Sequence, residues 1–428
     1  MLKTFKFRLY PTPAQEKCLF NTLAVCRHFY NMCLEDRKWS YELEGRSISK
    51  YDQVKQARLY RKTFPQAKPV YSQTLQSVAI DVSKAFDAFF RRVKAGEAPG
   101  YPRFKGRIHF NSFNFPQFGS GAKLDGRRLK LFGIGRVRVR WHRPMEGDIK
   151  TVRIVHKAGQ WYACFACDIE AKPELPKTGR IIGIDVGISA LVTTSEGEKV
   201  ENPKHYRLAQ AKLRRVQRSL SRKKRGSKSR RKALKRVQRQ QMHTANQRGD
   251  TLHKLSTALI QTCDGVALED LAIRNMVRNP HLSKSILDSG WGMFKQFLTY
   301  KAGNAGREIR FVNPAYTSKC CSDCGTAFQE FSLSTRWVTC DCGLSLDRDH
   351  NAAINILRKA GWDTPVVANG DTGLRRTRSP RLMAWGVSLS NEFKIEIGLT
   401  IVSILMRKIF LPERCLLKQK HTCKGHYD

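Results

Sequence analysis

The chain has 428 residues, and its 78 lysines and arginines outnumber its 36 aspartates and glutamates, which gives a formal net charge of +42. This cationic excess argues against an enzyme of small metabolites. It favours a polyanionic partner, because binding releases the counterions condensed on a nucleic acid. With 41% hydrophobic residues the chain can bury sizeable cores, and its length allows about two to four domains.

The first ten residues predict a strand, and a helix follows. Apolar and polar residues alternate over 3–10, as in a half-buried strand. Thr12 and Gln15 then have the spacing of a capping box, and Pro13 suits the first helical position, so we expect a helix from here to about Glu35. The N-terminus has no apolar stretch typical of a signal peptide, so we expect a cytoplasmic protein with reduced thiols.

A further helical pattern fills 50–95. Beyond Ser72, apolar residues line one face of this pattern, and the opposite face carries polar and basic residues such as Gln73 and Gln76. Solvation alone explains such a face. In so basic a chain, a nucleic-acid surface explains it equally well.

From 99 to 170 the helical pattern gives way to short alternating strands and turn residues. Together with the N-terminal strand they predict a small β-barrel, with the helices of about 11–95 inserted between its strands. Arg103 and Lys105 lie in a loop that mixes cations with aromatic residues, which suits contact with phosphates and bases. Cys164 and Cys167 lie on a predicted strand, where residues three apart point to opposite faces, so we expect buried thiols rather than metal ligands.

Three carboxylates far apart in the sequence suit the site of an RNase H-like nuclease. Asp185 interrupts one apolar strand and Glu269 ends another, and a carboxylate there is destabilising unless it is paired or binds a metal. Asp349 begins a predicted helix, and such a set binds two Mg²⁺ ions about 3.5–4 Å apart. Two alternatives stay open: Asp347 in place of Asp349, and Glu269 as a helix N-terminal charge.

Between the first two carboxylates, residues 212–239 carry Lys or Arg at about half of their positions and no acidic residue. Apolar residues at helical spacing on both sides of Gly226 predict two antiparallel helices with a tight connection. Charge runs are usually solvated faces, but the apolar stripe favours folded helices and the charge density favours contact with a nucleic-acid backbone. The candidate contacts in the connection are Arg222, Lys223, Lys224 and Arg225.

Four cysteines predict a structural zinc site. Cys321 and Cys324 form a C-x-x-C-G turn, and Cys340 and Cys342 form a second turn that is also followed by glycine. Two thiolate pairs at this separation converge tetrahedrally on Zn²⁺ in zinc ribbons. Cys320 is an alternative ligand, and the C-x-C turn is one residue shorter than usual.

The combined pattern resembles the TnpB (OrfB) family of bacterial insertion sequences, the RNA-guided relatives of type V CRISPR effector nucleases. The resemblance covers about residues 3–360. The stretches that carry it are 6–11, 102–107, 183–187, 220–227, 252–256, Thr317-Ser318 and 347–353.

The resemblance implies an α/β chain of several domains. They would be a wedge β-barrel over 1–10 and 96–172, a helical recognition insertion over 11–95, an RNase H-like RuvC nuclease domain over 178–316 and 344–361, and an inserted zinc ribbon over 317–343. The tail, 362–428, lies outside the resemblance, and we expect it to be mostly irregular. Its apolar stretch, 395–406, is too short to span a bilayer.

The resemblance also implies an activity, the RNA-guided cutting of double-stranded DNA by a transposable element's endonuclease. A guide RNA from the element's end would supply specificity by base pairing. Asp185, Glu269 and Asp349 would form the RuvC catalytic triad with two Mg²⁺ ions, beside one structural Zn²⁺. Gln73 and Gln76 would contact the DNA motif next to the target. The implied setting is a prokaryotic cytoplasm at the nucleoid, without a membrane, and a homodimer is left open.

Three other functions are compatible with the sequence. A protein-only strand-transfer transposase would use a similar carboxylate triad. A nuclease-dead RNA-guided repressor is a second alternative, but such a protein is expected to have lost these carboxylates. A zinc-ribbon protein that binds nucleic acid without catalysis is a third, and it gives no reason for a buried Asp185.

Overall fold

The computed structural model describes residues 1–171, 173–329, 332 and 335–362. The predictions for the tail beyond 362, including its apolar stretch, fall outside the described residues. In the part that is described, no helix combines the length and apolar character needed to cross a bilayer.

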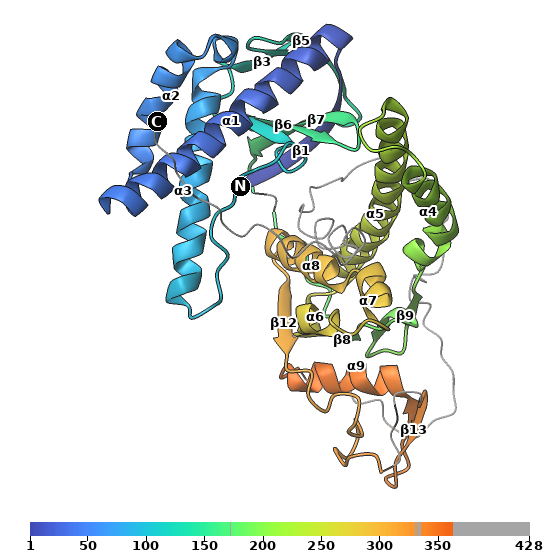
Figure 1. The fold of residues 1–428 in the computed structure, drawn as a ribbon. Helices are drawn as coiled ribbons and strands as arrows, with labels where there is room; N and C mark the ends of the chain where they lie inside the picture. Colours follow the sequence, from blue (N-terminus) through green and yellow to red (C-terminus); the bar gives the residue numbers. More distant parts are fainter. Residues whose placement is uncertain (172, 330–331, 333–334, 363–428) are drawn as a thin grey trace, which may run out of the picture. The chain divides into compact units, whose positions relative to one another are not determined.

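The first part of the chain is a seven-stranded antiparallel sheet with three helices between its first and second strands (Figure 1). Strand β1 (Leu2–Tyr10) pairs on one side with β7 (Gln160–Asp168) and on the other with β5 (Gly135–Arg140). The order is β2-β6-β7-β1-β5-β4-β3. The other strands are β2 (Ser112–Phe115), β3 (Ala122–Asp125), β4 (Arg128–Leu131) and β6 (Asp148–Lys157).

Helix α1 (Pro13–Glu44) begins as the sequence predicts. Thr12 Oγ1 accepts a hydrogen bond from Gln15 N at 3.3 Å, and Gln15 Oε1 accepts one from Thr12 N at 3.1 Å. The helix runs past the expected end near Glu35, because 36–44 contains neither glycine nor proline. It ends at Gly45, whose φ of +62° is the left-handed conformation that glycine adopts without strain.

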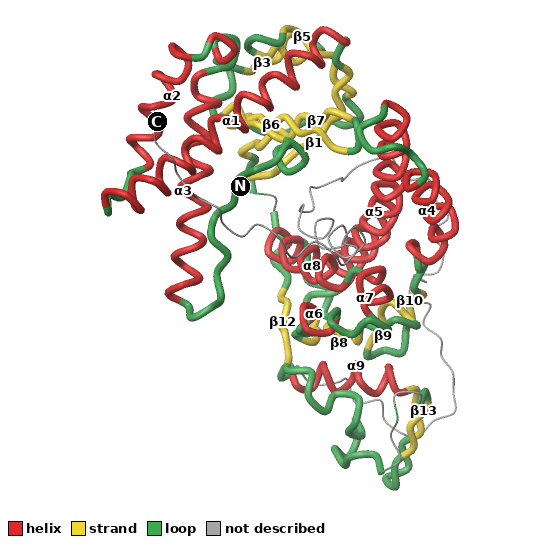
Figure 2. Tube along the Cα trace, in the orientation of Figure 1, coloured by secondary structure: helices red, strands yellow, loops and turns green. Residues whose placement is uncertain are grey.

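Helices α2 (Lys50–Thr63) and α3 (Ser72–Lys94) complete this region, and Figure 2 shows the three helices gathered together. They share one hydrophobic core with the sheet. Contributing side chains are Phe5, Phe7 and Leu9 from β1, Val137 and Val139 from β5, Leu19 and Phe29 from α1, and Leu75 and Val82 from α3. Cys164 and Cys167 are buried in β7, as predicted.

The second part of the chain is built on a five-stranded sheet with the order β10-β9-β8-β11-β12. Strands β8, β11 and β12 are parallel, whereas β9 and β10 extend the sheet in antiparallel fashion. The strands are β8 (Ile181–Asp185), β9 (Ala190–Thr194), β10 (Lys199–Glu201), β11 (Gly265–Glu269) and β12 (Glu308–Val312).

Helices α4 (His205–Ser221) and α5 (Lys228–Thr262) connect β10 to β11 and lie side by side, which confirms the predicted pair (Figure 1). Leu213, Leu220, Ala233 and Val237 are buried between them. Helix α5 continues through Gly249. The remaining elements are α6 (Ile273–Met276), α7 (Ser283–Ser289), α8 (Trp291–Ala305), a small hairpin of β13 (Trp337–Thr339) and β14 (Ser345–Asp347), and α9 (Arg348–Lys359).

Candidate catalytic and zinc sites

Asp185 and Glu269 end two neighbouring parallel strands. In the register of β8 and β11, Ile184 lies opposite Leu268, so the carboxylates that follow are neighbours at the carboxyl edge of the sheet. Adjacent strands are about 4.8 Å apart, which brings the two side chains within range of a shared ligand. Both carboxylates are only partly exposed.

Helix α9 brings Asp349 to the same edge. The helix packs on β8, and Figure 1 shows it running along the sheet. Gly183 permits this close approach, because a Cβ at that position would collide with the carbonyl oxygen of Ala353. Asp349 precedes Ala353 by four residues and therefore lies on the same face of the helix. On β8, Gly183 and Asp185 likewise point to the same face of the sheet.

The three carboxylates influence one another electrostatically. Burial, together with the negative charges of Glu269 and then Asp349, raises the pKa of Asp185 to about 7. Arg348 and a hydrogen bond from the backbone of Val186 act in the opposite direction. Burial also raises the pKa of Glu269, although a hydrogen bond from Thr317 opposes this rise. An edge that holds several carboxylates against burial and mutual repulsion suits a multivalent cation.

Asp347 has a different position from Asp349. Its Oδ1 accepts hydrogen bonds from the backbone N–H groups of Asp349 and His350 at 3.1 and 3.2 Å, so Asp347 caps the N-terminus of α9. Its Oδ2 lies 2.7 Å from Lys199 Nζ. Both oxygens of Asp347 thus have structural partners, which favours Asp349 as the third carboxylate of the site.

Two further side chains contact the carboxylates. Arg348 Nη2 lies 3.1 Å from Asp349 Oδ1, and both side chains are largely buried. The hydroxyl of Thr317 lies 2.5 Å from Glu269 Oε1. Neither residue was predicted from the sequence as part of the site. Arg348 is adjacent to Asp349 in the sequence, and Thr317 lies close to Cys321. Such proximity in sequence does not predict the direction of a side chain.

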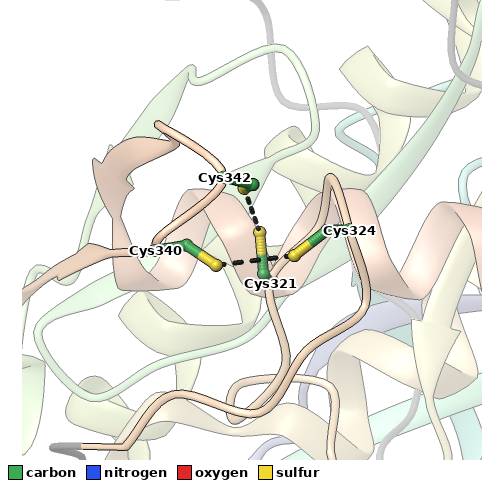
Figure 3. A group of neighbouring side chains, drawn as sticks. All are labelled: Cys321, Cys324, Cys340 and Cys342. Carbon is green, nitrogen blue, oxygen red and sulfur yellow. Dashed lines mark hydrogen bonds between the residues drawn. The ribbon is translucent and has the colours of Figure 1, made fainter.

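The four predicted zinc ligands converge, and their sulfur atoms point toward one another (Figure 3). Cys321 Sγ lies 3.6 Å from Cys342 Sγ, and Cys324 Sγ lies 3.4 Å from Cys340 Sγ. All four sulfurs fall within 4.8 Å of one another. A tetrahedron with Zn–S bonds of about 2.3 Å has edges of about 3.8 Å, so the residues fit Zn²⁺. The short C-x-C turn therefore does not prevent convergence.

Cys320, the alternative ligand, is outside this cluster and forms an isolated β-bridge with Ala327. Among the residues that the structure describes, the four cysteines are the one group of potential metal ligands this tightly gathered.

The predicted nucleic-acid contacts have varied environments. Arg222, Lys223, Lys224 and Arg225 are all exposed in the connection between α4 and α5, and Arg103 is exposed in its loop. Lys105 Nζ instead lies 3.8 Å from the ring centre of Tyr30. Gln73 donates a hydrogen bond to Gln117 at 2.8 Å, and Gln76 is partly exposed on the same helix.

A basic face of the seven-stranded sheet was not anticipated. Like charges lie directly opposite one another on neighbouring strands, an arrangement that destabilises a sheet. One acidic side chain on this face offsets part of the repulsion, since Asp125 forms an ion pair with Arg136 at 2.5 Å. The opposed cations are Arg8 with Arg140, Arg128 with Arg138, Lys130 with Arg136, and Lys123 with Lys130. The alternation of Val with Arg in β5 was visible in the sequence, whereas the register that opposes the cations was not.

Three family models match separate stretches of the chain. A probable transposase model, that of OrfB in IS605 elements, matches residues 164–280. The TNB domain of Cas12f1-like proteins matches 291–356, which include the four cysteines. A helix-turn-helix model of OrfB matches 1–46, where the structure has the strand β1 and the single long helix α1.

The chain is similar to curated proteins along most of its length. It is 36% identical to a putative RNA-guided DNA endonuclease of Streptomyces pristinaespiralis, covering 83% of this chain and 88% of that protein. It is 32% identical to the putative RNA-guided DNA endonuclease InsQ of Escherichia coli, covering 83% and 92%. It is also 26% identical to the CRISPR-associated endodeoxyribonuclease Cas12f1 of Sulfoacidibacillus thermotolerans, over 49% of this chain and 53% of that protein.

Proposed function

Because the chain belongs to the TnpB (OrfB) family, we propose that it is an RNA-guided endonuclease that hydrolyses double-stranded DNA. The observation that carries the proposal is the meeting of Asp185, Glu269 and Asp349 at one edge of the second sheet. Relatives aligned along most of the chain are named as putative RNA-guided DNA endonucleases, which supports the same reading.

Asp185, Glu269 and Asp349 would hold the catalytic Mg²⁺ ions. When bound, two such ions supply the activation of a water molecule and the stabilisation of the leaving oxygen. The chain's own contribution is to fix the carboxylates. Strand register sets the first two, and the close packing of α9 sets the third.

We assign the second sheet and its helices, 178–316 with 344–361, to an RNase H-like RuvC domain. The zinc ribbon, 317–343, enters between β12 and α9. The first sheet, 1–10 with 96–172, would be the wedge barrel, and 11–95 would be the recognition insertion. Support for this division comes from the two separate sheets and from the insertion of α1–α3 after β1.

The basic face of the first sheet and the connection 222–225 would contact the phosphates of guide RNA and target DNA. A polyanion relieves the repulsion between opposed cations such as Arg8 and Arg140, and it releases condensed counterions. Replacing Arg138 and Arg140 with glutamine should weaken binding and reduce its dependence on salt. Base pairing rather than the protein would then read the target sequence.

The first test is to express the gene with its native flanking DNA and to sequence the RNA that copurifies. One defined RNA that ends in sequence beyond the element supports the proposal and supplies the matched target for a cleavage assay. Heterogeneous RNA that salt removes would contradict guidance. Joined rather than cut DNA ends would indicate a strand-transfer transposase.

Matched variants test the carboxylates. Asp185→Ala and Asp349→Asn should abolish cutting and leave RNA binding intact. Asp347→Asn is the control, since asparagine caps a helix as well as aspartate does, and this variant should still cut. Full cutting by Asp185→Ala would remove that residue from the active site. Loss of cutting in Asp347→Asn alone would exchange the roles of the two aspartates.

A further inference from the structure

Thr317 joins the zinc ribbon to the carboxylate edge. Its hydroxyl lies 2.5 Å from Glu269 Oε1 and 3.0 Å from the carbonyl oxygen of Pro314. The residue is 1% exposed, so water does not compete freely for this hydrogen bond. A buried hydroxyl donor to one carboxylate oxygen fixes the rotation of the carboxylate and leaves the second oxygen for another ligand.

Two asparagines on α9 hold the backbone that carries Thr317. Asn355 Nδ2 donates to the carbonyl oxygens of Thr317 and Cys320 at 2.9 and 2.7 Å. Asn351 Nδ2 donates to Cys320 O at 2.8 Å, and its Oδ1 accepts from Ser322 N at 2.8 Å. Four residues separate the asparagines, so both point from one face of the helix. Asn351 is completely buried.

The two asparagines together form a clamp on the backbone around the first zinc knuckle, the turn that carries Cys321 and Cys324. Cys321, one of the four converging thiols, lies between the two backbone positions that Asn351 holds. The same helix carries Asp349 in its first turn. One rigid helix therefore positions one proposed catalytic carboxylate directly. Through the knuckle and Thr317, it also positions a second one.

We propose that Thr317 is a positioning residue for Glu269, and that the zinc knuckle and the α9 asparagines hold Thr317 in place. The ribbon then contributes to the cutting step as well as to stability. This inference rests on the proposed function, because the orientation of Glu269 matters only if that carboxylate binds the catalytic metal.

Thr317→Val tests the inference, since it removes the hydroxyl and keeps the shape of the side chain. Loss of an orienting partner of a metal ligand typically reduces metal affinity or activity by about 10–100-fold. We expect a fall of this size in kcat, a higher Mg²⁺ requirement and unchanged binding of RNA and target DNA. Thr317→Ser should restore both kcat and the Mg²⁺ requirement. Thr299→Val is the matched control, because the exposed Thr299 hydroxyl bonds only within α8.

Mn²⁺ binding gives a readout that does not depend on cutting. Electron paramagnetic resonance of the protein–guide RNA complex should show weaker Mn²⁺ binding in Thr317→Val than in the wild type, with a Glu269→Gln complex as background. Equal Mn²⁺ affinity and equal kcat would overturn the role of Thr317. A wild-type chain that cuts no matched target would overturn the proposed function, and the Mn²⁺ comparison would still decide on Thr317.

Asn355→Leu tests the clamp independently and keeps the hydroxyl. If the clamp acts through Thr317, this variant should lower kcat, and combining it with Thr317→Val should add little further loss. Zinc content, measured by mass spectrometry, should stay at one equivalent. Full additivity of the two changes would overturn the link between the asparagines and Thr317.

Discussion

Replacing Asp185 with asparagine should stabilise the protein while it abolishes cutting. Burial and the neighbouring carboxylates raise the pKa of Asp185 from 3.8 to about 7. At about 1.4 kcal/mol for each pH unit, the ionised carboxylate destabilises the folded chain by up to about 4 kcal/mol. Asparagine is isosteric and neutral, and it can accept the same hydrogen bond from the backbone of Val186. We therefore expect about 2–4 kcal/mol of added stability at pH 8.

The sign of the pH dependence follows from linkage. Between pH 3.8 and about 7 the folded chain retains a proton on Asp185 that the unfolded chain has lost, so folding stability falls as the pH rises. The penalty is complete above pH 7 and vanishes below pH 3.8. The advantage of Asp185→Asn should thus be large at pH 8 and clearly smaller at pH 5. Added Mg²⁺ should raise the melting temperature of the wild type only, because the ions bind its ionised carboxylates.

The assay is thermal and urea unfolding of both chains at pH 5 and pH 8 in Mg²⁺-free buffer that leaves zinc bound. Asp264→Asn is the control with the opposite sign. Hydrogen bonds from Thr178 and Gly179, and then the charge of Arg307, lower the pKa of Asp264, so its neutralisation should destabilise the protein at pH 8. A wild-type stability at pH 8 equal to or above that of Asp185→Asn would refute the reasoning. An advantage that did not change with pH would refute it equally.

Three other predictions concern packing, helix positioning and zinc. Gly249→Ala in α5 should raise the free energy of unfolding by up to about 1 kcal/mol, because a methyl group there meets no atom. Gly183→Ala should lower the free energy of unfolding by about 1–3 kcal/mol, because its methyl group collides with α9. Urea unfolding measures both changes. Asp288→Ala should lower the free energy of unfolding by about 3–5 kcal/mol in the same assay. Its nearly buried carboxylate pairs with Arg248 at 3.0 Å and accepts hydrogen bonds from the N-terminus of α4. A loss below about 1 kcal/mol would contradict this prediction. Cys324→Ser should remove the bound zinc and lower the melting temperature, and unchanged zinc content by mass spectrometry would refute that ligand assignment.

Local signals predicted the parts of the fold that depend on neighbouring residues. The capping box at Thr12 set the start of α1, and the spacing of four cysteines identified their cluster. The end of α1 was predicted too early, although Gly45 was the first residue able to end the helix. Asp185 was identified because a carboxylate inside an apolar strand requires a partner, and this argument needs no knowledge of the rest of the fold.

Contacts between distant segments could not be predicted in this way. Thr317 and Glu269 are 48 residues apart, and their hydrogen bond depends on how the start of the ribbon leaves β12. The opposition of Arg8 and Arg140 depends on the register between β1 and β5, and a shift of one residue would remove it. Sequence patterns specify which face a residue occupies, whereas tertiary packing decides which residue it meets.

Asp349 and Asp347 are close in sequence but have different neighbours. Asp347 ends a strand and caps the helix, so the hydrogen bonds and Lys199 that it contacts stabilise its charge locally and lower its pKa. Asp349 lies in the first turn of α9, where Arg348 is its ion-pair partner and Asp185 is a nearby like charge. The two cations that act on this edge, Arg348 and Lys359, are fewer than its three carboxylates, so the ionised edge is negatively charged. A divalent cation can therefore neutralise the negative charge around Asp349. At Asp347 the charge is already balanced by Lys199 and by the N-terminus of α9.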